Sequence, residues 1–342
     1  MKHHRLWFLL GILCANLALG YALYDRGRRG SAEDVIIAKR HLRAGAELFH
    51  YIGCEPLPAD RMETLLHGGL IASVYTDGSS DTTVLKDVET GATLWQGDIG
   101  GRAGQVVGYH DSVLTWIAQS KLYQGRSGGT SPSLLLSGVV VAGDTQHGTP
   151  LVLQYDTLSR TVHFGVYAPE KKGLVDTFAL DMGGHYNALS EYQLAYDGLF
   201  TRTSEHTIYT PFFFPRVLLF DSCGRSLGAI STIDQIPAPV IAYHDGLFVY
   251  KRGSAFRTNL AAQILGEKLY VLPYRVNRLN TQFILDVYSL PEGRYEYSVA
   301  LDAPERRGER LEIMEVFFSQ TQLCIEDTKG RRFTYQIVEP VA

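Results

Sequence analysis

The chain has 342 residues, of which 45% are hydrophobic and 20% charged, and its net charge is -4 at pH 7. This length suffices for one large all-β domain or two ordinary domains, and the ordinary apolar content excludes disorder as the default. Because acidic and basic residues are interspersed, the composition argues against a nucleic-acid-binding protein, which would carry a basic face.

The N-terminal stretch is predicted to enter a membrane. Residues 6–24 contain no charged side chain, and basic residues flank this run on both sides. About 20 mostly apolar residues cross a bilayer as a helix, so residues 1–24 are predicted to be a signal anchor with a transmembrane helix. The alternative is a signal peptide cleaved after the small residues Ala18 and Gly20.

Residues 25–60 are predicted to be a juxtamembrane linker. The beginning of this segment is basic and glycine-rich, which is typical of a spacer. The alanine, leucine and glycine pattern of residues 35–48 resembles the opening of the SAF domain, which follows the membrane anchor of some pilus-assembly proteins. The alternative for this stretch is a strand followed by a turn at Ala44 and Gly45. Pro56 and Pro58 disfavour a helix before them and indicate an extended boundary.

From residue 61 onwards the chain repeats one local pattern, two apolar runs joined by a tight turn. In the segment 283–302, runs rich in β-branched and aromatic residues flank the turn at 291–293, where Gly293 supplies a positive φ. This pattern predicts a β-hairpin. Similar glycine-centred hairpins are predicted at 84–99, 217–230 and 323–338.

A second kind of turn contains an aspartate. Asp111, Asp197 and Asp245 each follow a short apolar run and precede another. Repetition of four short strands in every 40–50 residues or so is typical of a β-propeller. We expect the aspartate turns to join the inner strands of the blades and the glycine turns to join the outer strands.

The sequence therefore predicts an all-β fold with a β-propeller at 61–342, in which seven blades are slightly favoured over six. A two-sheet sandwich is the alternative, but so long a succession of strands favours radial repetition. A strand from 34–75 is expected to complete the last blade, because open sheet edges aggregate. A short helix is expected at 59–66. The expected blades are 61–100, 103–138, 139–181, 183–233, 237–258, 260–302 and 308–342.

Two stretches resemble known propellers. The segment from Asp87 to Trp95 is similar to the repeat of pyrroloquinoline-quinone-type propellers, and residues 220–301 resemble the six- or seven-bladed propellers of bacterial membrane-anchored proteins. The second resemblance implies a single-pass protein of the bacterial inner membrane with its propeller in the periplasm or extracytoplasmic space, but it implies no reaction. Because the quinoprotein repeat is clear only once and no two cysteines are adjacent, no quinone cofactor is expected, and Trp95 is predicted to pack within the blades.

No set of residues matches a catalytic or metal-binding motif. Histidine and aspartate are adjacent at 110–111 and at 244–245, where an aspartate that caps its own backbone explains them as turn residues. The sequence has no serine-nucleophile elbow and no phosphate-binding glycine loop before a helix. No cofactor and no metal is therefore predicted. A further cluster without zinc-ligand spacing consists of His185, Glu191, Glu205 and His206.

These observations predict a membrane-tethered, extracytoplasmic module that binds or assembles a protein partner near the membrane and binds no nucleic acid. The alternative is an enzyme, namely a hydrolase, lyase or quinone-type oxidoreductase, that acts on a small substrate or glycan in the propeller funnel. Contacts are expected in the irregular segment 183–215, because loops carry function and aromatic residues dominate interfaces. The candidate partner-binding residues are Tyr186, Tyr192, His206, Tyr209 and Phe213.

Overall fold

The computed structural model describes most of the chain after residue 37, and in this part the fold is all-β. The one helix of the described ranges is α2 (Leu189–Ala195), and no helix in them is long and apolar enough to cross a membrane. The apolar run expected to do so, at 6–24, lies outside these ranges. The described residues are 38–44, 48–56, 62–66, 70–77, 80–87, 90, 92–99, 105–127, 132–145, 147–179, 182–184, 186–274, 283–302 and 313–338.

Most strands form antiparallel sheets of four in which neighbours in the sheet are also neighbours in the chain, as in a propeller blade. The first sheet contains β3 (Met62–Leu66), β4 (Leu70–Asp77), β5 (Ser80–Asp87) and β6 (Thr93–Gly97). The second contains β7 (Gln105–His110), β8 (Val113–Ala118), β9 (Lys121–Arg126) and β10 (Ser133–Ser137). The third contains β11 (Val139–Asp144), β12 (Pro150–Asp156), β13 (Thr161–Ala168) and β14 (Gly173–Ala179).

The second half of the chain continues this pattern with one interruption. The fourth sheet contains β15 (Gly198–Arg202), β16 (His206–Pro211), β17 (Arg216–Asp221) and β18 (Ser226–Ser231). A separate hairpin follows, formed by β19 (Ile241–His244) and β20 (Leu247–Tyr250). The fifth sheet contains β21 (Asn259–Leu265), β22 (Lys268–Pro273), β23 (Phe283–Ser289) and β24 (Tyr295–Leu301). The sixth contains β25 (Ile313–Phe318), β26 (Gln322–Asp327) and β27 (Arg331–Ile337).

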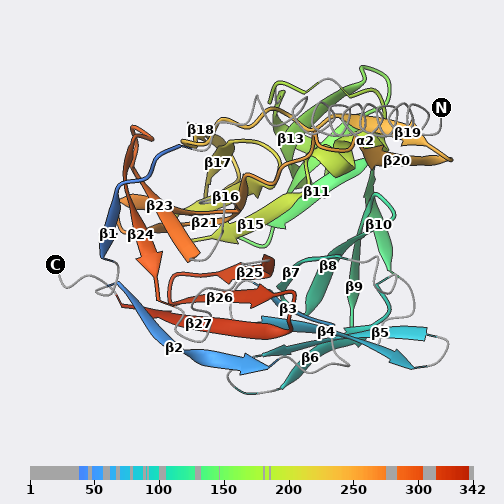
Figure 1. Cartoon of the computed structure of the whole chain (residues 1–342). Helices are drawn as coiled ribbons and strands as arrows, with labels where there is room; N and C mark the ends of the chain where they lie inside the picture. The colour runs from blue at the N-terminus through green and yellow to red at the C-terminus, as the bar shows by residue number, and fades with distance from the viewer. Residues whose placement is uncertain are drawn as a thin grey trace, which may run out of the picture.

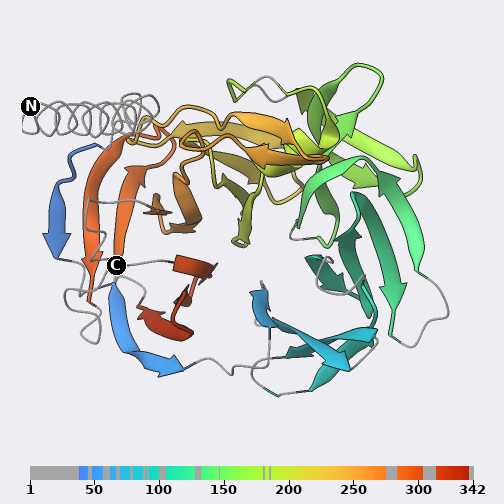
Figure 2. The same ribbon diagram turned by 45° about the vertical axis from the view of Figure 1, so that its right-hand side comes forward.

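The sheets are arranged around a common centre, as a propeller requires (Figure 1, Figure 2). The first strand of a sheet is the innermost one, since β7 contacts β11, β11 contacts β15, β15 contacts β21, and β21 contacts β25. Buried apolar side chains fill the space between neighbouring sheets, and one such cluster joins the fifth sheet to the sixth. The core is thus divided among the interfaces between blades.

A strand from near the N-terminus completes the last sheet. The antiparallel neighbour of β27 is β2 (Phe49–Pro56), with Phe49 opposite Ile337 and Pro56 opposite Arg331. This confirms the expectation that a strand from 34–75 fills the last blade. Upstream of β2, the short strand β1 (Leu42–Ala44) pairs in parallel with β24 and gives the fifth sheet a fifth strand. The proposed boundary at residue 60 stays a prediction, although residues on both sides of it share one sheet.

The turn chemistry predicted from the sequence is confirmed at most positions. Asp111 (φ 48°) begins the turn of the inner hairpin β7–β8, and Asp245 (φ 49°) begins the turn of β19–β20. Gly293 (φ 66°) lies in the turn of the outer hairpin β23–β24. The prediction for Asp197 is wrong, because the preceding residues form α2. There Gly198 starts β15, and an added Cβ would lie 2.6 Å from the carbonyl oxygen of Thr210.

Two further expectations differ from the structure. Residues 62–66 form β3 instead of the short helix expected at 59–66, because pairing with β4 satisfies their backbone groups. The segment 237–258, expected as the fifth of seven blades, contains a hairpin of two strands. The described residues thus form six sheets of four or five strands, and seven blades are not confirmed.

Ring closure gives a test of the fold. Deleting residues 333–342 removes most of β27, the strand that lies between β2 and β26. Because both neighbours would then present unpaired backbone groups, we expect the truncated chain to aggregate. Size-exclusion chromatography of the purified fragment measures this, with a chain that lacks only residues 339–342 as the control. A soluble, monomeric and cooperatively unfolding fragment would contradict closure through this pairing.

Candidate functional site

In the chain, the hairpin β19–β20 follows the fourth sheet and precedes the fifth; in space it lies beside α2 and is bonded to no other strand in the described part of the chain. Its two strands pair with Ile241 opposite Tyr250 and His244 opposite Leu247. Asp245 and Gly246 (φ 86°) form the two-residue turn between them, in which both residues have the positive φ that such a hairpin favours. The hairpin lies at the rim of the ring (Figure 1).

Tyrosine hydroxyl groups fix the base of the hairpin to the ring. The hydroxyl of Tyr250 donates to the carbonyl oxygen of Leu194 in α2 at 2.7 Å, and the ring of Tyr250 packs on Phe213 with centroids 4.9 Å apart. The hydroxyl of Tyr186 donates to the carbonyl oxygen of Pro239 at 2.8 Å, just before β19. The hairpin therefore has a fixed position and is not a loose loop.

The rest of the hairpin exposes apolar side chains to solvent. Tyr243 and Leu247 are each 67% exposed, Val240 is 50% exposed and Val249 is 39% exposed. We call these four side chains the hairpin surface. Single exposed apolar residues are normal on soluble proteins, but a contiguous group often marks a protein-binding surface. Val240 immediately precedes β19, and the pairing of the two strands puts Leu247 and Val249 on one face of the hairpin and Tyr243 on the other. The hairpin surface thus includes both faces within ten consecutive residues, and it is the first candidate site.

A second candidate lies where the inner strands of three neighbouring sheets end. His110, Asp144 and Arg202 are the last residues of β7, β11 and β15. Nη1 of Arg202 lies 3.1 Å from Oδ2 of Asp144 and donates to the carbonyl oxygen of Thr145 at 2.9 Å. The backbone of β7 passes close to Asp144 at Gly108, where a Cβ atom, if added, would lie 2.6 Å from the carboxyl group of Asp144. The absence of a side chain at Gly108 permits this approach.

Further polar contacts extend this arrangement around the ring. The side-chain amide of Gln263 on β21 donates to the carbonyl oxygen of Arg202 at 3.3 Å and to that of Phe318 on β25 at 3.2 Å. Gln320 donates to the carbonyl oxygen of Ile264 at 3.1 Å. Together with the contacts of Arg202, these hydrogen bonds join the inner strands of the third to sixth sheets. For chemistry, this arrangement contains the carboxyl group of Asp144, which can exchange a proton, and the guanidinium group of Arg202, which is already engaged in hydrogen bonds.

Burial makes the carboxyl group of Asp144 an unusually weak acid. It raises the pKa of Asp144 from the ordinary 3.8 to about 6, against the opposing effects of Arg202 and His110. Between roughly pH 4 and pH 6 the folded state therefore holds more protons than the unfolded state, so stability falls as the pH rises through this window. The whole effect is about 2–3 kcal/mol, at about 1.4 kcal/mol per pH unit.

We expect the substitution Asp144→Asn to remove this pH dependence. The difference in unfolding free energy between wild type and variant should shift in favour of the variant by about 2–3 kcal/mol between pH 4 and pH 7, because asparagine has no charge to bury. Urea unfolding at four pH values in this range measures the difference. A difference that stays constant over the range would contradict the raised pKa.

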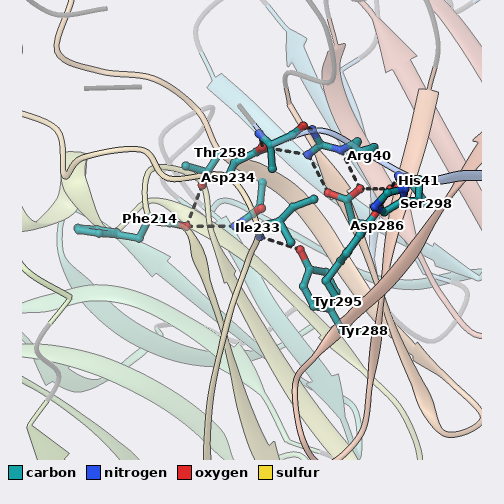
Figure 3. Close-up of polar contacts among 12 residues, drawn as sticks. Arg40, His41, Phe214, Ile233, Asp234, Thr258, Asp286, Tyr288, Tyr295 and Ser298 are labelled. Atoms are coloured by element: carbon teal, nitrogen blue, oxygen red, sulfur yellow. Dashed lines mark hydrogen bonds and ion pairs between the residues drawn. The ribbon is translucent and has the colours of Figure 1, made fainter. Parts of the chain in front are cut away.

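A third polar cluster is buried where the N-terminal segment meets the ring (Figure 3). Nε and Nη2 of Arg40 lie 2.8 Å from the two carboxylate oxygens of Asp286, and Nη2 lies 2.6 Å from Oδ2 of Asp234. The three side chains are between 2% and 5% exposed. The backbone N–H of Ala38 donates to Asp234 at 2.9 Å, and the hydroxyl of Ser298 donates to Asp286 at 2.6 Å. Since every charged group has a partner, this cluster holds the N-terminal segment in place.

The structure places the five predicted partner-binding residues mostly inside the protein. Tyr186, Tyr192, Tyr209 and Phe213 are all less than 8% exposed, and His206 is half-buried at the start of β16. The four buried rings belong to the packing around α2. Their burial gives no support to direct contact with a partner, and that role stays a prediction.

Two features of the structure were not expected from the sequence: the helix α2 and the exposure of the hairpin. A glutamate near the start of a helix is a sequence signal for its N-terminus, and Glu191 occupies this position in α2. Its carboxylate accepts hydrogen bonds from the backbone N–H groups of Asn187 and Ala188 at 2.6 and 2.9 Å. All four residues of β20 are apolar or aromatic, so the sequence alone does not distinguish a buried strand from one with an exposed face. Trp95 is 3% exposed and packs on Trp116 with centroids 6.0 Å apart, as its predicted packing role requires.

No group of histidine, cysteine, aspartate and glutamate side chains in the described ranges is arranged to hold a metal ion. Glu205 is exposed before β16, and Glu191 caps α2, so these two residues of the predicted cluster have separate surroundings. His206 begins β16, and the last member, His185, lies outside the described residues.

Comparison with known proteins adds similar folds but no family. No family model and no curated protein matches the sequence. Among solved structures, the chain is similar to BamB from Moraxella catarrhalis, with a TM-score of 0.41 and 12% identity over 85% of this chain and 100% of that one. It is similar to Hsv2 from Kluyveromyces lactis, with a TM-score of 0.45 and 10% identity over 84% of this chain and 75% of that one. For glutaminyl cyclase from Myxococcus xanthus, the TM-score is 0.37 and the identity 10%, over 88% of this chain and 100% of that one.

Proposed function

We propose that this chain is a protein-binding or assembly module whose contact element is the hairpin β19–β20. The observation that carries the proposal is the hairpin surface: four exposed apolar side chains, three on a two-stranded sheet and one just before it, on an element that is fixed to the ring. Apolar side chains on a rigid element bind with less loss of conformational entropy than those on a loose loop. The fixed base provided by Tyr186 and Tyr250 therefore favours recognition of a partner.

The unpaired strands of the hairpin support the same function. A sheet edge presents N–H and C=O groups that pair readily with another chain, and natural proteins usually shorten, charge or cover such edges. Apart from Lys251, which follows β20, the residues of both hairpin strands include no lysine, arginine or proline. An edge of this composition fits association better than it fits protection against association.

The proposal includes a place for the protein, at the bacterial inner membrane with the propeller in the periplasm or extracytoplasmic space. The uncharged run at 6–24 supports this part, since its length matches that of a membrane-crossing helix. A tether of this kind raises the effective concentration of a weak partner in the same membrane. The test is extraction of membranes with carbonate: we expect the full chain to stay in the pellet and a chain that starts at residue 38 to be released. Release of both would remove the tether from the proposal.

The binding function is tested with a photo-crosslinking amino acid at a single position in intact cells. We expect covalent protein adducts with the group at Leu247, on the hairpin surface. The matched control is Leu158, which is 94% exposed at the turn between β12 and β13 and is not part of the hairpin. Adducts at 247 but not at 158 support the function. Equal labelling at both positions, or none at either, contradicts it.

The enzymatic alternative would place the working site at the inner strand ends instead. The observation in its favour is Asp144, whose pKa of about 6 suits proton exchange near neutral pH. The two functions separate in one experiment, the Asp144→Asn substitution in the chain that carries the crosslinker at 247. Under our proposal the adducts persist, because the two sites lie on different sheets. Their loss in a folded variant would favour function at the ring centre.

A further inference from the structure

We propose that the partner at the hairpin is a second copy of this chain, which adds its own β20 to β20 in an antiparallel pair. This inference rests on the proposed function and names the occupant of its contact element. The pairing has two-fold symmetry, so the same surface is used on both copies. Three observations carry it: the direction of the backbone groups, the side chains that the pairing brings together, and the charges at the two ends of β20.

The backbone of β20 offers the groups that such a pair needs. The N–H of Lys251 donates to the carbonyl oxygen of Val240 at 2.8 Å, which makes these two residues a hydrogen-bonded pair of the hairpin. Hydrogen-bonded and non-hydrogen-bonded pairs alternate along an antiparallel ladder. The N–H and C=O groups of Phe248 and Tyr250 therefore point away from β19, and no backbone hydrogen bond to them exists within the described residues.

A pair centred on Phe248 uses these groups and brings complementary side chains together. Phe248 then faces Phe248 of the second copy as a hydrogen-bonded pair. Leu247 faces Val249 of the second copy, which covers two exposed apolar side chains at each end of the pair. At each end of the pair, Lys251 of one copy lies beside the turn of the other copy, which contains Asp245. Both the apolar cross-strand contact and the approach of opposite charges favour this pairing.

The charges distinguish this register from its neighbour. Centring the pair on Val249 also uses the outward backbone groups, but it places Leu247 opposite Lys251 and leaves Asp245 without a basic partner across the pair. In the described chain Lys251 is exposed and makes no ion pair, whereas Asp245 has only His244 of its own chain, 3.2 Å away. The register centred on Phe248 therefore satisfies both the apolar and the charged residues.

The paired segment is short, so we expect a weak dimer in solution and a more populated one on a membrane, where tethering raises the effective concentration. The test uses the full-length chain in membranes, with Cys223→Ser to remove an exposed thiol. Leu247→Cys and Val249→Cys chains are mixed. Directly opposed residues lie about 4.5–5.5 Å apart, within reach of a disulfide, but residues offset by two lie about 7–8 Å apart. We expect the mixture to form the disulfide dimer at least about tenfold faster than either chain alone.

Charge variants provide a second measurement of the same pair. Lys251→Glu should reduce the crosslinked fraction several-fold, and Asp245→Lys added to it should restore the fraction, because the ion pair is then reversed. Since residue 245 lies in the turn, Asp245→Asn serves as the variant that keeps the turn and removes the charge. Phe248→Pro removes one outward N–H without touching the hairpin ladder, and should abolish the crosslink.

The outcomes separate this inference from the proposed function. A register-specific crosslink that the charge reversal restores supports the second copy. Adducts at position 247 with another protein, together with equal crosslinking of mixed and single cysteine chains, overturn the second copy and leave the binding function standing. The chain with Leu158→Cys measures how fast thiols meet by random collision. If mixed and single cysteine chains crosslink equally fast and at the rate of this chain, the second copy is also overturned. Absence of every adduct at 247 removes the binding function itself.

Discussion

Replacement of Arg40 by methionine is expected to destabilise the protein by about 3–5 kcal/mol. The side chains of Asp234 and Asp286 are at most 5% exposed, and both lose their cationic partner in this variant. A buried ion pair need not add much stability over an apolar replacement, but breaking one leaves an uncompensated charge away from water. We expect urea unfolding at pH 7 to show the loss directly.

Two comparisons isolate this cause. Lys39→Ala removes an exposed cation from the neighbouring residue and should change stability by less than about 0.5 kcal/mol. Adding Asp234→Asn and Asp286→Asn to Arg40→Met should recover much of the loss, because no charge is then left buried. A variant that remains as destabilised after these additions would show that packing, and not the uncompensated charge, dominates.

The same variant should loosen the N-terminal segment before the ring unfolds. The backbone N–H of Ser298 donates to the carbonyl oxygen of His41 at 2.9 Å, at the point where β1 meets β24. Because Arg40 immediately precedes this contact, we expect hydrogen exchange at Ser298 to become faster than exchange at the centre of β23. Equal acceleration at both places would contradict a local role for the cluster.

Tyr209→Ala is expected to cost about 3–5 kcal/mol, the range for removing a fully buried aromatic ring. The side chain is 0% exposed, and its ring packs on Phe200 and Phe164 with centroids 4.7 and 5.4 Å away. Its hydroxyl donates to the carbonyl oxygen of Tyr196. Tyr209→Phe keeps the ring and leaves that carbonyl without its donor, so it should cost about 1–3 kcal/mol.

An exposed tyrosine provides the matched control for this series. Tyr243→Ala removes the same ring from the hairpin surface, where it is 67% exposed, and should change stability by less than about 0.5 kcal/mol. Thermal or urea unfolding of the three variants measures the order. If Tyr209→Ala and Tyr243→Ala cost the same, the burial of Tyr209 is contradicted.

This contrast decides how a partner surface should be mapped. Combined Tyr209→Ala and Phe213→Ala substitutions would remove two buried rings, so their effect on binding would report on folding. Substitutions at Leu247 and Val249 change exposed side chains and leave the packing around α2 intact. They are the variants with which to compare partner profiles.

The sequence by itself determined the local structure of the chain. Gly293, Asp111 and Asp245 specified tight turns, and the alternating apolar residues beside them specified hairpins, because both depend on neighbouring residues and on backbone conformation. The expected blade ranges match the sheets closely, except for 237–258. Even the closing strand was predictable, since a ring of sheets leaves an edge that some other segment must cover.

Only the tertiary structure decided which residues would be buried and which distant residues would meet. Arg40 contacts Asp234 and Asp286, which are 194 and 246 residues away in the chain, and no local pattern links them. Tyr209 and Tyr243 both lie in strands, yet Tyr209 is enclosed against the third sheet through Phe164 and Tyr243 faces solvent. Strand periodicity specifies which residues share a face, but what covers that face depends on where the neighbouring sheets and α2 lie.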